Sequence, residues 1–596
     1  MIRTPLRPLA RILDARQKGE NPDAIENENK RIRHEQMRDN ARLRAEGRLL
    51  VLGVFFFCAF GVVGARMGML ASTDPVEPRA HAPGAVISAS RADIVDRHGN
   101  LLATNFDTHA LYAQPKHMVD PVMAAKGLVK VFPDLDEAQL VKDFTGKRKF
   151  LWIKKKISPE QKQAVHDIGD PGLLFAPRDM RLYPNGTLAA HIMGGASYGK
   201  EGVHAAEVIG VAGVEKYFDD YLRDPVNAGK PLALSLDLTV QAASERILWG
   251  GMKLMNAKGA TSVLMDVKTG EVISMVSLPT FDPNNRPRPA VEGDASDSPL
   301  FNRAVQGVYE LGSVFKIFAA TQAIELGLVN TETVIETKGP MKVGGFRIGE
   351  FQGKNYGALS VADIIVKSSN RGTGRMALQI GPKRQQEFLK SLGFFEATPF
   401  EIVEAAGGKP LLPKKWTDLS AVTISYGHGM STSPMHLAAG YAAIANGGFK
   451  VTPTLIKQDT PKQGPRVMSE RAARDGRMML RKVVSKGTAS FARVPGYFVG
   501  GKTGTADKPK PRGGYYKKKT LATFASIFPA HDPKYVLIVT LDEPSENSGD
   551  KPRRTAGWTA VPVAAEMIRR VAPLLGLRPA VEPVKRSMVT LTSSSN

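Results

Sequence analysis

Ser313 and Lys316 are three residues apart in the stretch YELGSVFK, directly before an apolar, helix-forming run. Positions i and i+3 share one face of a helix, so the lysine lies within reach of the serine hydroxyl. A serine needs a base to attack a carbonyl, and a lysine can be that base only when its ammonium is destabilised, as apolar surroundings and a helix N-terminus would do. The pair alone is weak evidence, because about two such spacings arise by chance in a chain of this length. Taken by itself, the pair is better explained by a capping serine followed by a surface lysine.

Two later segments could complete the chemistry. Ser368 and Asn370 lie in Ser-Ser-Asn, 55 residues after Ser313, where a second hydroxyl can relay a proton and an amide can anchor a carbonyl and the lysine. Residues 502–505 read KTGT after an apolar segment with two glycines. We predict a strand there that places a cation and a hydroxyl beside a substrate carboxylate and brings a backbone N–H to an oxyanion. The other Lys-Thr-Gly, at 268–270, is predicted to be a hairpin turn.

The order S-x-x-K, S-x-N, K-T-G resembles that of class A β-lactamases and penicillin-binding proteins. Other segments extend the resemblance over nearly everything after residue 70, where the predicted membrane span ends. RADIVDRHGNLLAT, RLYPNGTLAAHIMG and GVAGVEKYFDDYL are similar to pedestal motifs, and FNRAVQGVYELGSVFK is similar to the approach to the nucleophile. The chain resembles the class B penicillin-binding proteins, which are membrane-anchored peptidoglycan D,D-transpeptidases. The segment ISYGHGMSTSPMHLAAGYAAIANGG is similar to the septal, FtsI-type branch, whereas the elongation branch more often has Gly-Gln-Gly there.

The resemblance implies a role for each motif residue. Neutral Lys316 takes the proton of Ser313, which attacks the D-Ala-D-Ala carbonyl of a stem peptide. Ser368 passes a proton to the departing D-alanine, and Asn370 orients the lysine and the substrate amide. An acceptor amine then resolves the acyl-enzyme, whereas β-lactams acylate the serine and remain there.

The same resemblance implies how the substrate is held. The terminal carboxylate contacts the segment formed by Lys502, Thr503, Gly504 and Thr505, and the oxyanion accepts from backbone N–H groups of Ser313 and Thr505. No cofactor and no metal is expected, because the histidines show no ligand spacing and Cys58 is the single cysteine. His428 is interpreted as structural near the cleft, since no carboxylate partner is evident for it at a triad-like spacing. Two departures from the family pattern are Leu311, where many relatives have proline, and a more basic rim around Ser-Ser-Asn.

A membrane anchor is predicted from the charge-free run between Leu49 and Ala65, which reaches about 20 residues if Arg66 snorkels. A buried core helix or a cleaved signal peptide is a weaker alternative, given the length of the run and the 48 residues before it. Those 48 residues carry 12 Lys/Arg against 8 Asp/Glu, so the N-terminus is expected in the cytoplasm and the catalytic part in the periplasm.

The expected fold class is α+β, with a β-lactamase-like transpeptidase domain built on a central, mainly antiparallel sheet, an α+β pedestal before it and one transmembrane helix. Apolar runs at 261–277, 520–530 and 535–544 predict its strands, and 555–577 a terminal helix. The predicted boundaries are 1–48 for a cytoplasmic tail, 49–70 for the transmembrane helix, 71–233 for linker and pedestal, 234–577 for the transpeptidase domain, and 578–596 for a C-terminal tail.

The formal net charge of +23 fits nucleic acid, an anionic membrane surface or an acidic polymer. Outside a membrane the nucleic-acid interpretation fails, and the basic stretch KRKFLWIKKK is assigned to glycan or lipid head groups. Expected partners are stem peptides ending in D-Ala-D-Ala, β-lactams, the inner membrane and divisome proteins at the septum. No glycosyltransferase unit is visible, so the resemblance implies an FtsW-type glycan polymerase as partner. Alternatives left open are an elongation-type transpeptidase, a membrane-tied β-lactamase or penicillin sensor, and an inactive scaffold.

Overall fold

The computed structural model describes residues 13–72, 91–201, 206–227, 229–289, 291–458, 460–510 and 513–580, and divides the chain into two compact units, Met1–Ile87 and Ser88–Asn596. The first unit contains one long helix, α2 (Pro22–Ser72), in which Glu46–Met67 is long and apolar enough to cross a membrane. The predicted span, 49–70, lies within this helix. The polar residues from 22 onward continue the same helix, whereas the predicted linker from 73 and the tail from 581 lie outside the described residues.

The pedestal in the second unit is built around strand β2 (Leu101–Ala113). It pairs antiparallel with β1 (Ile94–Val95), β3 (Leu151–Ile157) and β4 (Leu173–Leu182). β1 in turn pairs in parallel with β7 (Leu232–Ala233). A turn with Gly99 in the left-handed region joins β1 to β2. A small apolar core lies under α3 (Pro121–Val131), α4 (Glu137–Phe144) and α5 (Pro159–His166). α5 begins with a capping box of Ser158 and Gln161.

The rest of the pedestal connects this sheet to the catalytic domain through short elements. They are α6 (Ala190–Met193), the two-stranded pair β5 (Gly195–Glu201) and β6 (Ala206–Ala212), α7 (Gly213–Tyr217) and α8 (Asp219–Arg223). A buried ion network ties them together: Glu215 on α7 accepts from Arg91 and Arg181 at 2.7 Å each, and Arg91 also donates to Asp219 at 2.7 Å. Every cation in this network therefore faces an anion.

The catalytic domain is organised around a five-stranded sheet in the order β14-β15-β16-β8-β9, antiparallel throughout. Its strands are β8 (Gly259–Asp266), β9 (Val272–Leu278), β14 (Gly500–Pro509), β15 (Tyr515–Phe528) and β16 (Tyr535–Asp542). The runs predicted as strands form this sheet, and residues 268–270 form the turn between β8 and β9. The predicted antiparallel sheet is confirmed. β8, β9 and β16 are buried on both faces, which explains why their apolar residues do not alternate.

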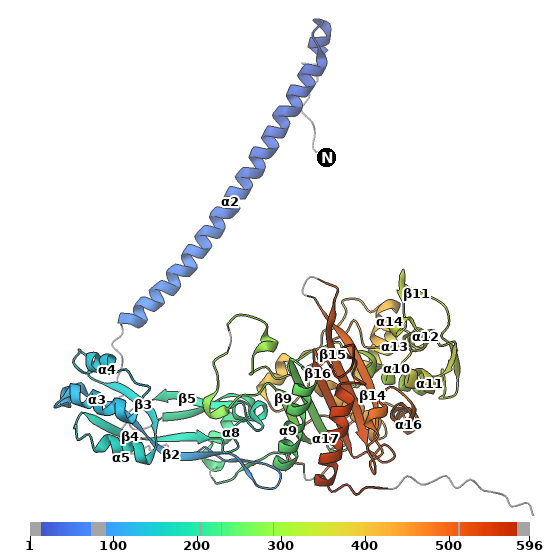
Figure 1. Cartoon of the computed structure of the whole chain (residues 1–596). Helices are drawn as coiled ribbons and strands as arrows, with labels where there is room; N and C mark the ends of the chain where they lie inside the picture. The colour runs from blue at the N-terminus through green and yellow to red at the C-terminus, as the bar shows by residue number, and fades with distance from the viewer. Residues whose placement is uncertain are drawn as a thin grey trace, which may run out of the picture. The chain divides into compact units, whose positions relative to one another are not determined.

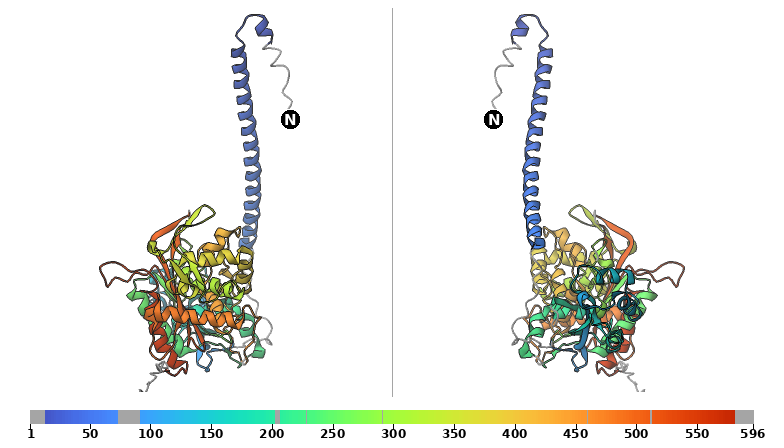
Figure 2. Two further views of the ribbon diagram at one scale, coloured as in Figure 1. Left: turned by 90° about the vertical axis from the view of Figure 1, so that its right-hand side faces the viewer. Right: turned by 90° about the vertical axis from the view of Figure 1, so that its left-hand side faces the viewer.

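Helices cover the sheet. α9 (Leu238–Leu254) and α17 (Ala560–Leu574), the predicted terminal helix, pack together against the sheet in Figure 1, while α15 (Pro434–Ala445), buried at all twelve residues, packs on β8, β15 and β16. α16 (Glu470–Lys486) lies against β14. The lime and yellow helices in Figures 1 and 2 gather beside the sheet and pack on one another: α10 (Lys316–Glu325), α11 (Val361–Lys367), α12 (Asn370–Ile380), α13 (Pro382–Ser391) and α14 (Asp418–Ser425). The residues of the three motifs lie where this helical group meets β14.

Candidate active site

Ser313 lies in a 3₁₀ turn, Gly312–Phe315, and the α-helix begins only at Lys316. The sequence predicted an α-helix from the serine onward. In the structure Gly312 is in the left-handed region with φ 63°, and the first turn after it is a 3₁₀ turn, which is tighter than an α-helical turn. The turn is pressed against β14. A Cβ on Gly504 would lie 2.2 Å from the Leu311 carbonyl oxygen, and one on Gly312 would lie 2.9 Å from that of Thr505. Both glycines are therefore needed for the close approach of the serine to the Lys-Thr-Gly strand.

Lys316 is fully buried and directs its Nζ at the Ser-Ser-Asn segment. The nitrogen lies 2.5 Å from the Ser368 carbonyl oxygen, 2.7 Å from Asn370 Oδ1 and 3.1 Å from Ser368 Oγ. None of the hydrogen bonds among the described residues joins it to Ser313 Oγ. A neutral amine fits these contacts, because two N–H groups serve the two carbonyl oxygens and the lone pair faces the Ser368 hydroxyl.

Lys502 reaches the same hydroxyl from strand β14. Its Nζ lies 2.9 Å from Ser368 Oγ and 3.1 Å from the Thr503 carbonyl oxygen, and the side chain is also fully buried. The three motifs thus meet at one oxygen atom. Ser368 adopts a left-handed backbone conformation, φ 62° and ψ 43°, at the end of α11, which is unusual for a residue other than glycine.

Burial disfavours both ammonium charges. It lowers the pKa of Lys316 from 10.5 to about 7, against the opposing effect of the Glu350 carboxylate. The pKa of Lys502 is lowered well below its usual range, first by burial and then by the charge of Lys316. Two like charges facing one hydroxyl cannot both persist in a dry site, so the cluster holds at most one ammonium near neutral pH. A lysine in this state can act as a base.

Glu350 is a residue that the sequence analysis did not single out. Its buried carboxylate accepts from Ser369 Oγ at 2.5 Å, from Asn370 N at 2.7 Å and from Arg371 N at 3.0 Å, and so caps α12. It follows a small hairpin of β11 (Met341–Val343) and β12 (Phe346–Ile348). The cap fixes the Ser-Ser-Asn turn, and its charge raises the pKa of the neighbouring Lys316. No local pattern identifies Glu350, because it reaches Ser369 from 19 residues away.

Thr503, Thr505 and Asn370, the other predicted side chains, also lie near this cluster, and each already makes a hydrogen bond within the protein. Thr503 Oγ1 shares a hydrogen bond with Thr488 Oγ1 at 2.7 Å, and Thr505 Oγ1 accepts from Ala556 N at 3.0 Å. Asn370 Nδ2 donates to the Gly349 carbonyl oxygen at 2.9 Å. These contacts hold the side chains in place, and their predicted roles toward a substrate stay predictions.

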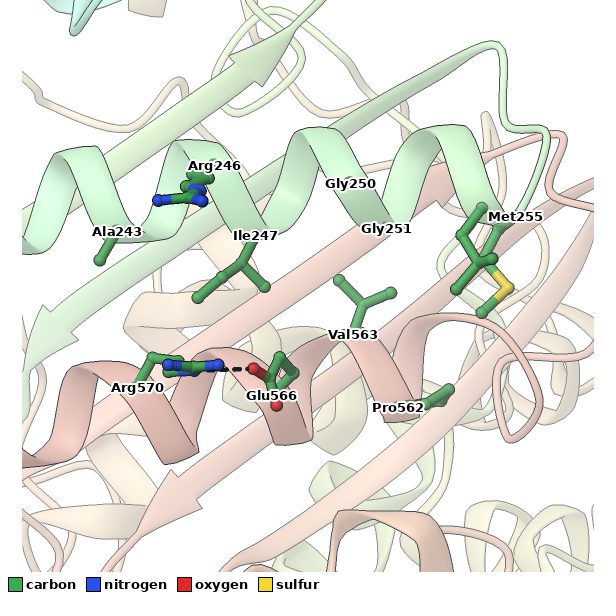
Figure 3. Close-up of a pocket in the computed structure, with 11 residues that line it drawn as sticks. Ala243, Arg246, Ile247, Gly250, Gly251, Met255, Pro562, Val563, Glu566 and Arg570 are labelled. Atoms are coloured by element: carbon green, nitrogen blue, oxygen red, sulfur yellow. Dashed lines mark hydrogen bonds and ion pairs between the residues drawn. The ribbon is translucent and has the colours of Figure 1, made fainter.

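A groove of about 560 Å³ between α9 and α17 contains none of the motif residues. Figure 3 shows the two helices side by side, with Ile247 and Val563 between them and Arg570 paired with Glu566 at one edge. Within the described part of the chain, no group of three or more His, Cys, Asp or Glu side chains is arranged to hold a metal ion. The chemistry suggested by the geometry is therefore concentrated at Ser313 and the two lysines.

Comparison with known proteins gives the family. Residues 260–564 match the penicillin binding protein transpeptidase domain, and residues 86–226 match the penicillin-binding protein dimerisation domain. These ranges fall within the predicted domains 234–577 and 71–233.

Relatives match over most of their length. The probable peptidoglycan D,D-transpeptidase FtsI of Caulobacter vibrioides is 32% identical over 93% of this chain and 92% of its own length, and the probable peptidoglycan D,D-transpeptidase PenA of Neisseria gonorrhoeae is 31% identical over 77% of this chain and 81% of its own. The crystal structure of penicillin-binding protein 3 from Mycobacterium tuberculosis complexed with ampicillin aligns with a TM-score of 0.63 at 26% identity, covering 83% of this chain and 97% of that one. This chain belongs to the family of penicillin-binding proteins with a transpeptidase domain.

Proposed function

We propose that this chain is a peptidoglycan D,D-transpeptidase that cross-links stem peptides through an acyl-enzyme on Ser313 and is inhibited by β-lactams. The observation that carries the proposal is the convergence of Lys316 and Lys502 on Ser368 Oγ, beside the turn that bears Ser313. Family membership and the names of the relatives point to the same reaction.

The acylation step follows from these contacts. Ser313 Oγ attacks the carbonyl carbon of the penultimate D-alanine as its proton passes to neutral Lys316. The lysine returns that proton through Ser368 Oγ to the nitrogen of the departing D-alanine, 3.1 Å being a suitable transfer distance. Lys502 and the Thr503 and Thr505 hydroxyls hold the terminal carboxylate, and backbone N–H groups of Ser313 and Thr505 receive the oxyanion.

The nucleophile assignment is tested by intact-mass measurement after exposure to a fluorescent penicillin. The wild-type protein should gain the mass of one penicillin, and Ser313→Ala should gain none. Label on the alanine variant would show that another residue is acylated. Rapid release of hydrolysed penicillin by the wild type would favour a membrane-tied β-lactamase, and reversible binding without acylation would favour a scaffold.

We place the catalytic domain in the periplasm, with the N-terminus in the cytoplasm and the helix segment Glu46–Met67 in the inner membrane. The excess of basic residues before this segment supports that orientation. Protease added to intact spheroplasts should then degrade the catalytic domain and spare the first 45 residues. The opposite pattern would reverse the topology.

We assign the protein to the division septum, with an FtsW-type glycan polymerase as its partner, on the basis of the Tyr-Gly-His-Gly segment and the FtsI relatives. Depletion of the protein should produce filaments. Rounded cells would instead indicate the elongation branch. Co-purification of the polymerase with the full-length chain, and its loss when α2 is exchanged for an unrelated anchor, would test the partnership.

A further inference from the structure

A second polar group lies beside the Ser313 turn, away from the lysines. The segments 309–312 and 427–432 run next to each other, joined by two hydrogen bonds between Tyr309 and Thr432 and one from Gly312 N to the Gly427 carbonyl oxygen at 3.1 Å. Glu310 extends from the first segment and accepts from Gly429 N at 2.7 Å. A carboxylate three residues before the nucleophile is thus fixed to the Tyr-Gly-His-Gly loop.

Two rings complete this group. Tyr515 donates its hydroxyl to both Glu310 oxygens, at 3.1 and 2.9 Å, and its ring lies 6.1 Å from that of His428. The His428 Nδ1 is buried without a hydrogen-bond partner among the described residues, and the Tyr426 backbone favours the protonated form of the imidazole. In its neutral form the ring keeps one unprotonated nitrogen, which can accept a proton.

The charge of this group contrasts with the rest of the site. Glu310 and Asp507 are the acids that act on His428, and Lys316 is the cation that does so. Burial lowers the pKa of His428 below its usual 6.5, although the two carboxylates oppose this effect. In a chain with a net charge of +23, a carboxylate beside a neutral imidazole makes a local site for a cation.

The acylation mechanism uses none of these residues, yet the overall reaction needs a second substrate. Its attacking group is a primary amine, which is an ammonium ion at neutral pH and must lose a proton before its nitrogen can bond to the acyl carbon. The two lysines suit a carboxylate and repel such a substrate. Glu310 and His428 have the opposite preference.

We propose that Glu310, His428 and Tyr515 form the acceptor subsite, in which Glu310 binds the ammonium of the second stem peptide and His428 is the base that deprotonates it. The inference rests on the proposed transpeptidase function. The ammonium transfers one proton to the unprotonated ring nitrogen of His428, its nitrogen bonds to the acyl carbon, and the C–O bond to Ser313 breaks. The second proton of the nitrogen passes through Ser368 and Lys316 to Ser313 Oγ, and the imidazolium then releases its proton to water.

The test separates transfer from acylation in the full-length protein. An acyl-D-alanyl thioester serves as donor, and D-alaninamide, which carries an ammonium, or hydroxylamine, which is uncharged at pH 8, serves as acceptor. Transfer and hydrolysis products are counted per acyl-enzyme formed. Glu310→Gln keeps an oxygen for Gly429 N and for the Tyr515 hydroxyl and removes only the charge. It should raise the D-alaninamide concentration for half-maximal transfer about tenfold and leave that for hydroxylamine unchanged.

His428→Gln should lower the maximal rate of transfer to D-alaninamide about 100-fold relative to hydrolysis. In the wild type the ratio of transfer to hydrolysis should fall as the pH drops through the pKa of His428, and this acid limb should vanish in the variant. Using the same acceptor for both proteins cancels the titration of the acceptor. The groups that set this limb are Glu310, Asp507 and Lys316, with the Tyr426 and Tyr515 rings against the imidazole.

Exposed residues of the same types provide matched controls: Glu387→Gln on α13 and His117→Gln in the pedestal should behave as the wild type. Unchanged transfer in both Glu310→Gln and His428→Gln, with the serine still acylated, would overturn the acceptor subsite alone. Equal losses with the charged and uncharged acceptors would also overturn it, because they would indicate a structural role. A wild-type protein that neither penicillin nor the thioester acylates would instead refute the proposed transpeptidase function.

Discussion

Two buried clusters of charged residues in this molecule solve the same physical problem in opposite ways. In the pedestal, Arg91 and Arg181 each meet the Glu215 carboxylate at 2.7 Å, so burial is offset by pairing. In the catalytic domain, Lys316 and Lys502 face one neutral hydroxyl and each other. Here the cost of burial is relieved by loss of protons, as the lowered pKa values of both lysines show.

The difference separates a structural ion network from a reactive one. Paired charges keep their protonation state over a wide pH range and hold elements together. Two ammonium groups that face each other in a dry site lose protons, and the neutral amines that result can accept the proton of a serine nucleophile. Stability and activity should therefore respond to different substitutions in the two clusters.

The largest effect is expected from Lys316→Met. The change should lower the rate of Ser313 acylation by penicillin about 1000-fold, because the base is lost. The free energy of unfolding should change by about 2 kcal/mol or less, since an apolar chain fits the buried site and only the hydrogen bonds to Ser368 and Asn370 are lost. Stopped-flow acylation and thermal unfolding measure the two quantities. If the variant is acylated slowly and is also strongly destabilised, the lysine cluster has a structural role as well as a catalytic one.

Glu215→Gln should show the reverse pattern. Removing the anion leaves Arg181 buried without a counter-charge and Arg91 paired with Asp219 alone, which should cost about 3–5 kcal/mol in the free energy of unfolding. Penicillin acylation measured well below the unfolding temperature should match the wild type. If acylation falls in proportion to stability, the two clusters are not independent.

The wild-type protein should show a pH profile set by Lys316. Below pH about 7, the pKa given by burial, acylation should fall about tenfold per pH unit, because only the neutral amine accepts the serine proton. Between pH about 7 and 10.5 this lysine is protonated in the unfolded state and neutral in the folded state. The contribution of Lys316 to the free energy of unfolding therefore rises with pH in this range. An acylation rate that is flat from pH 5 to 9 would contradict the assignment.

The smallest effect is expected from Glu350→Gln. Its charge raises the pKa of Lys316, so the midpoint of the acylation profile should move to lower pH in the variant. The plateau rate should fall by about tenfold or less, because the amide oxygen still accepts hydrogen bonds at the start of α12. Glu336 is exposed at the end of β10 (Val334–Glu336), and Glu336→Gln is the control. A midpoint that does not move would leave Glu350 as a cap only.

Much of this arrangement could be predicted from local patterns. The apolar runs at 261–277, 520–530 and 535–544 predicted strands because continuous burial leaves a composition signal, and the glycines around 502–505 predicted close approach. The 3₁₀ turn at Ser313 was missed, since the conformation depends on how Gly312 packs against β14 and not on helix propensity.

Local sequence patterns did not predict the contacts between segments that are far apart in the chain. Ser368 and Lys502 are 134 residues apart, and family resemblance alone placed them in one site. Glu350 acts through a tertiary contact that follows a short hairpin, where no periodic pattern is present. His428 was interpreted as structural because no carboxylate was evident at a triad-like spacing; the fold brings Glu310 to its loop from 119 residues away.

The pair of lysines around Ser368 has a consequence for ligand binding. In the ligand-free protein the lowered pKa values of the two lysines favour loss of a proton from this site. A ligand carboxylate beside Lys502 raises the pKa of its amine, so the amine takes up a proton when the ligand binds. Formation of the complex with a β-lactam or a stem peptide is then coupled to proton uptake from solvent. The heat of binding will consequently depend on the ionisation enthalpy of the buffer, so that calorimetry in two buffers counts the protons that this site captures.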